Sequence, residues 1–176
     1  MSGPQLQGKV AIVTGAAGGF GEGIARLFVA EGAKVLIADL DGDKAQTVAA
    51  SLGANAKAVR CDVSKRADID AAVKACVAAF GVPDIVVNNA GTTHKNQPML
   101  DIDEATFDRV FAVNVKSIYH MTQAVLPLMR ERKSGCIVNI GSTAGIRPRP
   151  GLSWYNASKG AVNLLSKSMA VELGPD

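Results

Sequence analysis

The sequence has few of the residues that mark several common protein classes. Its three cysteines, Cys61, Cys76 and Cys136, are odd in number and show no CxxC spacing. Neither a disulfide framework nor a zinc site is therefore expected, and no other metal site is predicted. Cysteines used in this way fit a reducing compartment, so we expect a cytoplasmic protein.

Long apolar runs are also missing. The first residues, MSGPQLQGK, are polar, and no apolar run approaches the roughly 18 residues that a membrane span requires. We therefore expect neither an export signal nor contact with a membrane.

Strong charge is absent as well, because the net charge is only +3 and aromatic residues make up 5% of the chain. The one basic cluster, RERK at 130–133, lies just before Ser134 and Gly135. Cations favour the C-terminus of a helix, which explains the cluster locally. Since no aromatic residues are interleaved with it, no nucleic-acid partner is expected.

What the chain does contain is a regular alternation of short apolar runs and helical stretches. It predicts strands at 9–15, 34–39, 56–62, 84–91 and 135–142, and helices at 20–32, 44–52, 67–80 and 104–132, with a last helix opening near Tyr155. Uniformly apolar strands separated by helices are typical of a parallel sheet covered on both faces. We predict one α/β domain over 1–176, a Rossmann-type doubly wound parallel sheet of strand order 3-2-1-4-5. Ligands should bind beyond the strand ends, between strands 1 and 4.

A glycine-rich turn, TGAAGGFGEG, follows the first predicted strand. It spaces Gly15, Gly19 and Gly21 as GxxxGxG, which lets backbone N–H groups and a helix N-terminus approach an anion such as a dinucleotide phosphate. The pattern alone is a weak signal, and its position between a strand and a helix strengthens it. A purely structural turn is the alternative.

The second predicted strand ends at Asp39. An acid at this position accepts hydrogen bonds from the adenosine ribose of NAD and repels the 2′-phosphate of NADP. Neither the glycine turn nor Leu40 offers a cation for that phosphate, so NAD is favoured over NADP. The alternative is an aspartate that only caps the next turn.

The segment YNASK places Tyr155 and Lys159 one helical turn apart on the same face. Alone, this pair is most simply a surface pair. Together with TGxxxGxG at 14–21 and NNAG at 88–91, however, it resembles the short-chain dehydrogenase/reductase family from about Gly8 onward. The sequence is similar in character to glucose dehydrogenase-like and 3-oxoacyl-thioester reductase-like members.

The resemblance implies an NAD(H)-dependent oxidoreductase that interconverts a secondary alcohol and a ketone, with a small-molecule substrate. It implies four catalytic residues: Asn114, Ser142, Tyr155 and Lys159. With the positions discussed above, the cofactor-contacting set becomes Gly15, Gly19, Phe20, Gly21, Asp39, Leu40, Asp62, Val63, Asn89, Ala90, Gly91, Tyr155 and Lys159. Asp62 and Val63 would border the adenine, and 89–91 would line the adenosine side.

The chemistry of these residue types suits the implied roles. A nicotinamide supplies only a hydride, so a proton must reach the carbonyl oxygen from elsewhere. A free phenol has a pKa near 10, and an adjacent ammonium favours its ionised form, which explains why Tyr155 as general acid/base would need Lys159. Ser142 would donate to the carbonyl oxygen, while Asn114 would connect Lys159 to solvent through water.

Two further residues are candidates for substrate contact beside Ser142. His94 follows the fourth strand and lines the substrate mouth unless it is an exposed loop residue. Arg147 lies in the loop GIRPRPGLSW and would pair with an acidic substrate group unless it is simply solvated. His120 is expected on a helix, without metal-ligand spacing.

Two other classes of function remain open from the sequence. An NAD-binding module without turnover would keep the fold and the cofactor site. Another Rossmann-type enzyme, such as a methyltransferase, would explain the glycine turn but not the four catalytic positions.

The family pattern continues beyond the helix that ends in VELGPD, with further strands, a substrate-covering segment and a helix. We therefore expect either a longer protein, or a shortened chain that binds NAD weakly, associates through its fifth strand and turns over little. The fifth strand should be a sheet edge. The helices carrying Asn114 and Lys159 are expected to pair copies into a homo-oligomer, a dimer or tetramer.

Overall fold

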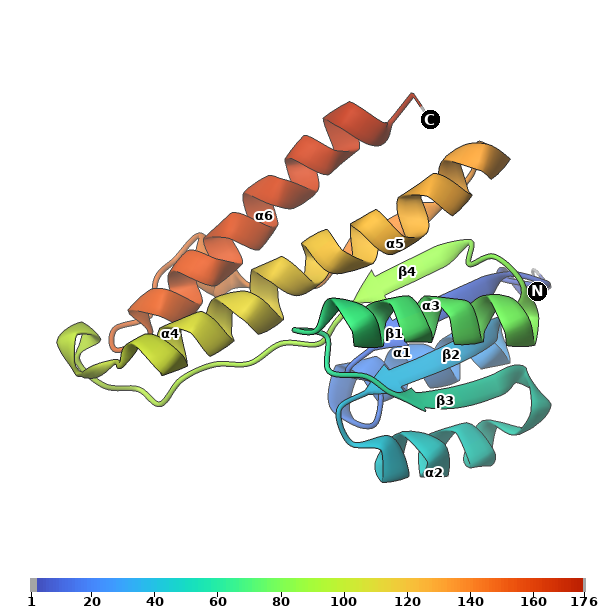
Figure 1. The fold of residues 1–176 in the computed structure, drawn as a ribbon, viewed down its shortest axis with the longest axis horizontal. Helices are drawn as coiled ribbons and strands as arrows, with labels where there is room; N and C mark the ends of the chain where they lie inside the picture. The colour runs from blue at the N-terminus through green and yellow to red at the C-terminus, as the bar shows by residue number, and fades with distance from the viewer. Residues whose placement is uncertain (1–2, 176) are drawn as a thin grey trace.

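The computed structural model describes residues 3–175, which form a parallel sheet with helices on both faces (Figure 1). The strand order is β3-β2-β1-β4-β5, which confirms the predicted order. The strands are β1 (Val10–Thr14), β2 (Lys34–Asp39), β3 (Ala56–Arg60), β4 (Ile85–Asn88) and β5 (Cys136–Asn139). The helices are α1 (Gly19–Ala30), α2 (Gly42–Leu52), α3 (Arg66–Phe80), α4 (Glu104–Phe111), α5 (Ser117–Arg132) and α6 (Ser153–Leu173).

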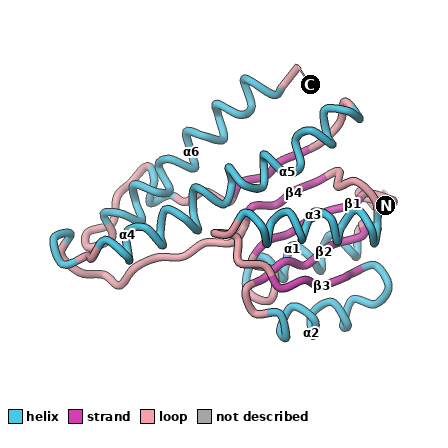
Figure 2. The backbone as a smooth tube through the Cα atoms, viewed as in Figure 1, coloured by secondary structure: helices cyan, strands magenta, loops and turns pink. Residues whose placement is uncertain are grey.

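Apolar side chains on both faces of the central strands build two cores. Ile12 and Val86 face the core shared with α3 and α5, while Val13 and Val35 face the core shared with α1 and α2. All five residues of β1 are buried, which explains why its sequence is apolar throughout instead of alternating. Figure 2 shows the same arrangement of strands and helices as a tube.

Four of the five strands end earlier than predicted, whereas β2, Lys34–Asp39, has the predicted bounds. The predicted fourth strand, 84–91, is observed only as Ile85–Asn88, because the Asn89 and Ala90 N–H groups donate to the Thr14 side chain instead of to a neighbouring strand. The polar residues at these strand ends therefore belong to loops beyond the sheet.

The predicted continuous helix over 104–132 was wrong in one respect. Its middle, Ala112–Lys116, is a π-helical turn (η3) that separates α4 from α5. The Ser117 N–H donates to the Ala112 carbonyl five residues earlier, and the Ser117 hydroxyl donates to the Val113 carbonyl at 2.6 Å. These bonds satisfy backbone groups in the wider turn.

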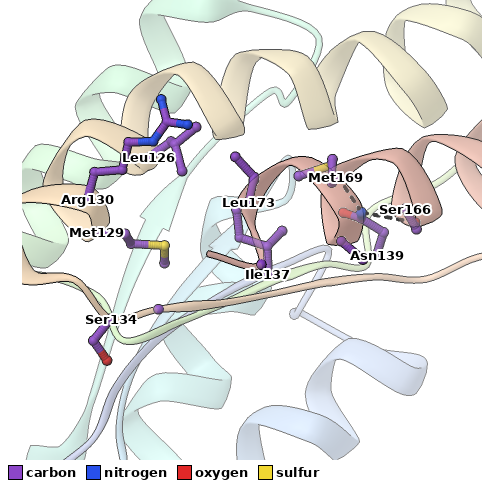
Figure 3. Close-up of a pocket in the computed structure, with 12 residues that line it drawn as sticks. Leu126, Met129, Arg130, Ser134, Ile137, Asn139, Ser166, Met169 and Leu173 are labelled. Atoms are coloured by element: carbon purple, nitrogen blue, oxygen red, sulfur yellow. Dashed lines mark hydrogen bonds between the residues drawn. The ribbon is translucent and has the colours of Figure 1, made fainter. Parts of the chain in front are cut away.

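β5 forms one edge of the sheet, as expected, and its side chains are only partly covered. Beside it lies a groove of about 360 Å³ between β5, α5 and α6 (Figure 3). Apolar side chains lining it include Leu126, Met129, Ile137, Met169 and Leu173. Within residues 3–175, no helix has the length and apolar character to cross a membrane.

Candidate active site

The glycine turn has the geometry that an anion site requires. Gly15 and Gly19 have φ angles of +63° and +57°, a region that other residues rarely enter. A side chain at Gly21 would collide with the Gly15 carbonyl, whereas the space beside Gly18 and Gly19 is open. The N-terminus of α1, which begins at Gly19, is therefore accessible to a phosphate.

Asp39 stands beside this turn, at the end of β2. One carboxylate oxygen accepts from the Ala17 N–H at 2.9 Å and the other from the Asp41 N–H at 3.0 Å. Through Asp41 the aspartate caps its own turn, as the capping alternative requires, and through Ala17 it ties that turn to the glycine turn. Each oxygen keeps lone-pair capacity for a ribose hydroxyl, so the residues present fit the adenosine end of NAD. Phe20 and Leu40, predicted cofactor contacts, are exposed.

Asp62, beyond β3, is engaged within its own turn. Its carboxylate accepts from the Ser64 hydroxyl at 2.7 Å and the Ser64 N–H at 3.1 Å. These bonds, the hydroxyl one foremost, hold the pKa of Asp62 below its usual value. Val63 is buried. Contact of this pair with an adenine stays a prediction.

The ends of β1 and β4 are clamped together by side chains. The Thr14 hydroxyl accepts from the Asn89 and Ala90 N–H groups, both at 3.0 Å. The Asn89 side chain donates to the carbonyls of Thr14 and Gly15 at 2.8 and 3.0 Å. This clamp fixes the NNAG turn against the glycine turn. Sequence reasoning assigned no role to Thr14, although it is the first residue of the quoted TGxxxGxG motif.

Tyr155 and Lys159 occupy the first turns of α6, one turn apart. Lys159 is only 6% exposed, and its ammonium donates to the Ile140 carbonyl beyond β5 at 2.8 Å. Burial lowers the pKa of Lys159, because desolvation disfavours the charged form. The interpretation of this pair as two simple surface residues is therefore wrong for Lys159. Tyr155 is half-buried.

Ser142 follows β5 and precedes a short 3₁₀ turn, Thr143–Gly145. Its hydroxyl accepts from the Ala144 N–H at 3.1 Å, and a Cβ added at Gly145 would lie 2.6 Å from the Gly160 nitrogen. The 142–145 segment therefore packs directly on α6, beside the turn that carries Lys159.

Asn114 lies in the π-helical turn and is buried. Its side-chain amide pairs with the backbone of Thr92, accepting from the N–H at 2.8 Å and donating to the carbonyl at 2.9 Å. A Cβ placed on Gly91 would lie 3.5 Å from Asn114 Oδ1 and 3.6 Å from Lys159 Nζ. The alternative that Asn114 merely bonds a neighbouring helical carbonyl is wrong, since it joins the segment after β4 to the helix.

The two segments predicted to face the substrate contact each other. The Asn96 side chain donates to the Pro150 carbonyl at 2.8 Å, and the Gln97 N–H donates to the Gly151 carbonyl at 3.1 Å. Arg147 is exposed. His94, in contrast, is buried, so the exposed-loop alternative was wrong. Its Nδ1 lies 2.7 Å from the Lys95 carbonyl. Substrate contact by either residue stays a prediction.

These observations place a glycine turn, an acid at the end of β2, and a half-buried tyrosine one turn from a buried lysine at the carboxyl edge of one sheet. The family model for short chain dehydrogenases matches residues 9–176. The chain belongs to the short-chain dehydrogenase family. Across residues 3–175 of this short-chain dehydrogenase, no group of three His, Cys, Asp or Glu side chains is arranged to hold a metal ion.

Among its relatives, this short-chain dehydrogenase is 50% identical to the 4-formylbenzenesulfonate dehydrogenase of Comamonas testosteroni, over 95% of this chain and 68% of that protein. It is 45% identical to the galactitol 2-dehydrogenase of Agrobacterium fabrum, over 96% of this chain and 66% of that protein. The chain thus spans about two thirds of the length of these relatives.

A solved structure is similar over nearly the whole chain. The 3-ketoacyl-(acyl-carrier-protein) reductase of Brucella melitensis, described in complex with NADH, gives a TM-score of 0.94 at 47% identity. The match covers 97% of this chain and 72% of the reductase. The Rossmann-type architecture is therefore shared with a nucleotide-bound relative.

Proposed function

We propose that this chain carries the cofactor site and the catalytic residues of an NAD(H)-dependent oxidoreductase that interconverts a secondary alcohol and a ketone. The observation that carries the proposal is the buried Lys159, one turn from Tyr155 and held to the Ile140 carbonyl. Burying an ammonium costs free energy even when it is hydrogen-bonded, and titratable groups kept at such a cost cluster at functional sites.

In this proposal the cofactor, when bound, supplies or accepts a hydride, and the protein's own residues handle the proton. Tyr155 exchanges a proton with the substrate oxygen, and the Lys159 ammonium stabilises the ionised phenol. Ser142 Oγ donates to the oxygen as negative charge grows. Asn114, beside Lys159 and Gly91, holds the turn through which solvent would return the proton.

NAD is the proposed cofactor in preference to NADP. Support comes from Asp39, whose two oxygens retain acceptor capacity at the end of β2. The relative from Brucella melitensis is described as an NADH complex. The comparisons do not distinguish the two cofactors for this chain, so the preference rests on the electrostatics of Asp39.

The substrate class is proposed from both the relatives' names and the site. Galactitol 2-dehydrogenase and 3-ketoacyl reductase are names that refer to secondary-alcohol and ketone centres. The name 4-formylbenzenesulfonate dehydrogenase refers instead to an aldehyde that carries a sulfonate. Arg147, exposed in the loop beyond Ser142, is the proposed partner for an acidic group on the substrate.

The decisive test combines binding and turnover. NADH binding is measured by fluorescence, and NADH oxidation is followed with a panel of ketones and aldehydes, with and without acidic groups. Turnover on ketones supports the proposal. Turnover on aldehydes alone would contradict a secondary-alcohol substrate and favour a primary alcohol and an aldehyde instead. NADH binding without turnover on any substrate would favour a binding module.

We also propose that copies of the chain associate through α5 and α6. Both helices carry large apolar side chains in exposed positions: Tyr119, Leu164 and Val171. Exposed apolar residues on neighbouring helices are typical of an interface between subunits. Sedimentation of the protein and of a Leu164→Glu variant tests this, because a charge at the interface should dissociate the assembly, and an unchanged mass would contradict it.

A further inference from the structure

Ser158 lies between Tyr155 and Lys159 in α6, and its side chain has two hydrogen-bond partners. The residue is fully buried. Its hydroxyl donates to the Tyr155 carbonyl at 2.7 Å and accepts from Asn114 Nδ2 at 2.9 Å. Ser158 therefore joins the helix that carries the Tyr/Lys pair to the π-helical turn.

The Asn114 amide depends on this hydroxyl for its full set of partners. Its oxygen accepts from the Thr92 N–H, while its nitrogen donates to the Thr92 carbonyl and to Ser158. An amide nitrogen has two N–H donors, so both are used. Without the Ser158 hydroxyl, one buried donor loses its partner, and the amide gains freedom to turn away from Thr92.

The position of Asn114 matters because its neighbourhood includes Lys159. Gly91 sits next to both the Asn114 oxygen and the Lys159 ammonium. A small displacement of the π-helical turn would therefore change the surroundings of the buried ammonium. A π-helical turn is rare and interrupts the regular α-helical hydrogen bonds, so the side-chain bonds of Asn114 contribute to holding this turn in place.

We propose that Ser158 is a positioning residue: its hydroxyl holds the Asn114 amide, and thereby fixes the spacing between the Thr92 segment, the π-helical turn and Lys159. The kinetic part of this inference rests on the proposed function. The structural part, the coupling of Ser158 to the Thr92 N–H, does not.

The same helix offers a matched control. Two turns later, the Ser166 hydroxyl donates to the Val162 carbonyl at 2.8 Å and accepts from Asn139 Nδ2 at 3.1 Å. Ser166 thus makes the same two kinds of bond, but it lines the groove beside β5 (Figure 3). Ser158→Ala and Ser166→Ala remove equivalent atoms from one helix.

The first measurement needs no activity. Amide hydrogen exchange at the Thr92 N–H is followed by NMR in the full chain without cofactor. We expect Ser158→Ala to accelerate exchange about tenfold, because one hydrogen-bond partner is lost. In Ser166→Ala the exchange rate at the Thr92 N–H should be unchanged. Equal exchange in the two variants, or unchanged exchange in Ser158→Ala, would overturn the proposal.

The second measurement is kinetic. In Ser158→Ala we expect kcat to fall about tenfold, the Kd of NADH to stay within about twofold, and the pH profile of kcat to shift, because the environment of Lys159 changes. Ser158→Thr, which keeps a hydroxyl, should restore the profile. Loss of kcat with an unshifted profile would argue for a purely structural role.

The role of Ser158 can be tested even if the variant does not fold or the protein shows no turnover. If Ser158→Ala does not fold, Ser158→Cys replaces the hydroxyl with a weaker partner of similar shape, and the same exchange comparison decides. If the unmodified protein shows no turnover, the proposed function fails, but the Thr92 exchange still supports or overturns the role of Ser158.

Discussion

The chain before Asp84 and the chain from Asp84 onward are built differently inside. Among the described residues, the first part buries 21 apolar side chains and a single polar one, Thr14. The second part buries nine apolar side chains and eight polar ones: Asn88, His94, Asn114, Ser117, His120, Asn156, Ser158 and Lys159. The first part is packed as an ordinary core, and the second part gives up apolar packing to position polar groups.

This difference separates stability from chemistry. Apolar burial is the main source of folding free energy, whereas buried polar groups cost free energy unless they are hydrogen-bonded. Departures from simple core packing are expected where a protein functions. Substitutions in the first part should therefore change folding and cofactor choice, and substitutions in the second should change turnover.

The largest effect is expected from Tyr155→Phe. Loss of the phenolic proton should lower kcat by about 10²- to 10⁴-fold, while the Kd of NADH and the unfolding temperature change little. Tyr119→Phe, on the exposed side of α5, is the matched control because Tyr119 is the chain's other tyrosine. Steady-state kinetics decide, and retained turnover in Tyr155→Phe would remove its assigned role.

The next largest effect lies in the first part of the chain. Ile12 is fully buried in β1, and Ile12→Ala should lower the free energy of unfolding by about 2–5 kcal/mol. Val138 in β5 is 40% exposed, and Val138→Ala should change the free energy of unfolding by only about 0.5 kcal/mol. Urea titrations compare the two, and similar losses would break the contrast between the central and edge strands.

A smaller effect is expected at the cofactor site. Asp39→Ala should weaken NAD binding by about 10- to 100-fold, because hydrogen bonds to a charged group are lost. It should also narrow the preference for NAD over NADP. Asp43→Ala, at an exposed position in the first turn of α2, serves as the control. Dissociation constants for both cofactors are the measurement, and tighter NADP binding by the unmodified protein would contradict the proposed specificity.

The smallest effect concerns Asp84, where the two parts meet. Its carboxylate accepts from the Val10 N–H at 2.8 Å and from Arg132 at 2.6 Å. Burial alone would raise the pKa of Asp84, but these partners hold it below its usual value. The bonds therefore stabilise the fold above the unfolded pKa of about 3.9, and this contribution is lost as the pH falls through the lower folded pKa.

Asp84→Asn should accordingly lower the free energy of unfolding by about 1 kcal/mol at pH 7. Below pH 4 the difference from the unmodified protein should shrink, because Asp84 then takes up a proton in the unfolded chain before it does so in the folded protein. Denaturant unfolding at pH 7 and pH 3 tests this. A difference that is equal at both pH values would show that the charge of Asp84 is not what matters.

The first part of the chain was the easier one to predict. Its β-branched runs, such as VAIVT and KVLIAD, are buried strands in the predicted order, because uniform apolar character is a strong signal for parallel strands. The glycine turn and Asp39 also lie at neighbouring strand ends, where the parallel topology requires them.

The second part was harder to predict for a physical reason. The segment AVNVK fits an α-helix as well as a π-helical turn, and Asn114 within it bonds Thr92 and Ser158, which lie 22 and 44 residues away in the sequence. The environment of Lys159 likewise depends on a distant segment, since its ammonium donates to the Ile140 carbonyl, 19 residues earlier. Side chains whose value lies in tertiary hydrogen bonds carry no periodic signal in the sequence.

The π-helical turn also constrains how many residues must lie between α4 and α5. Deleting one residue of 112–116 other than Asn114 would allow a regular α-helix, and it would rotate α4 by about 100° and shift it by about 1.5 Å relative to α5. Phe107 of α4 packs edge-on against Trp154, with ring centroids 5.2 Å apart, immediately before Tyr155. The rotation would aim a different face of α4 at that ring. The number of residues between Phe107 and Ser117, and not only their identity, is thus part of what fixes the surroundings of Tyr155.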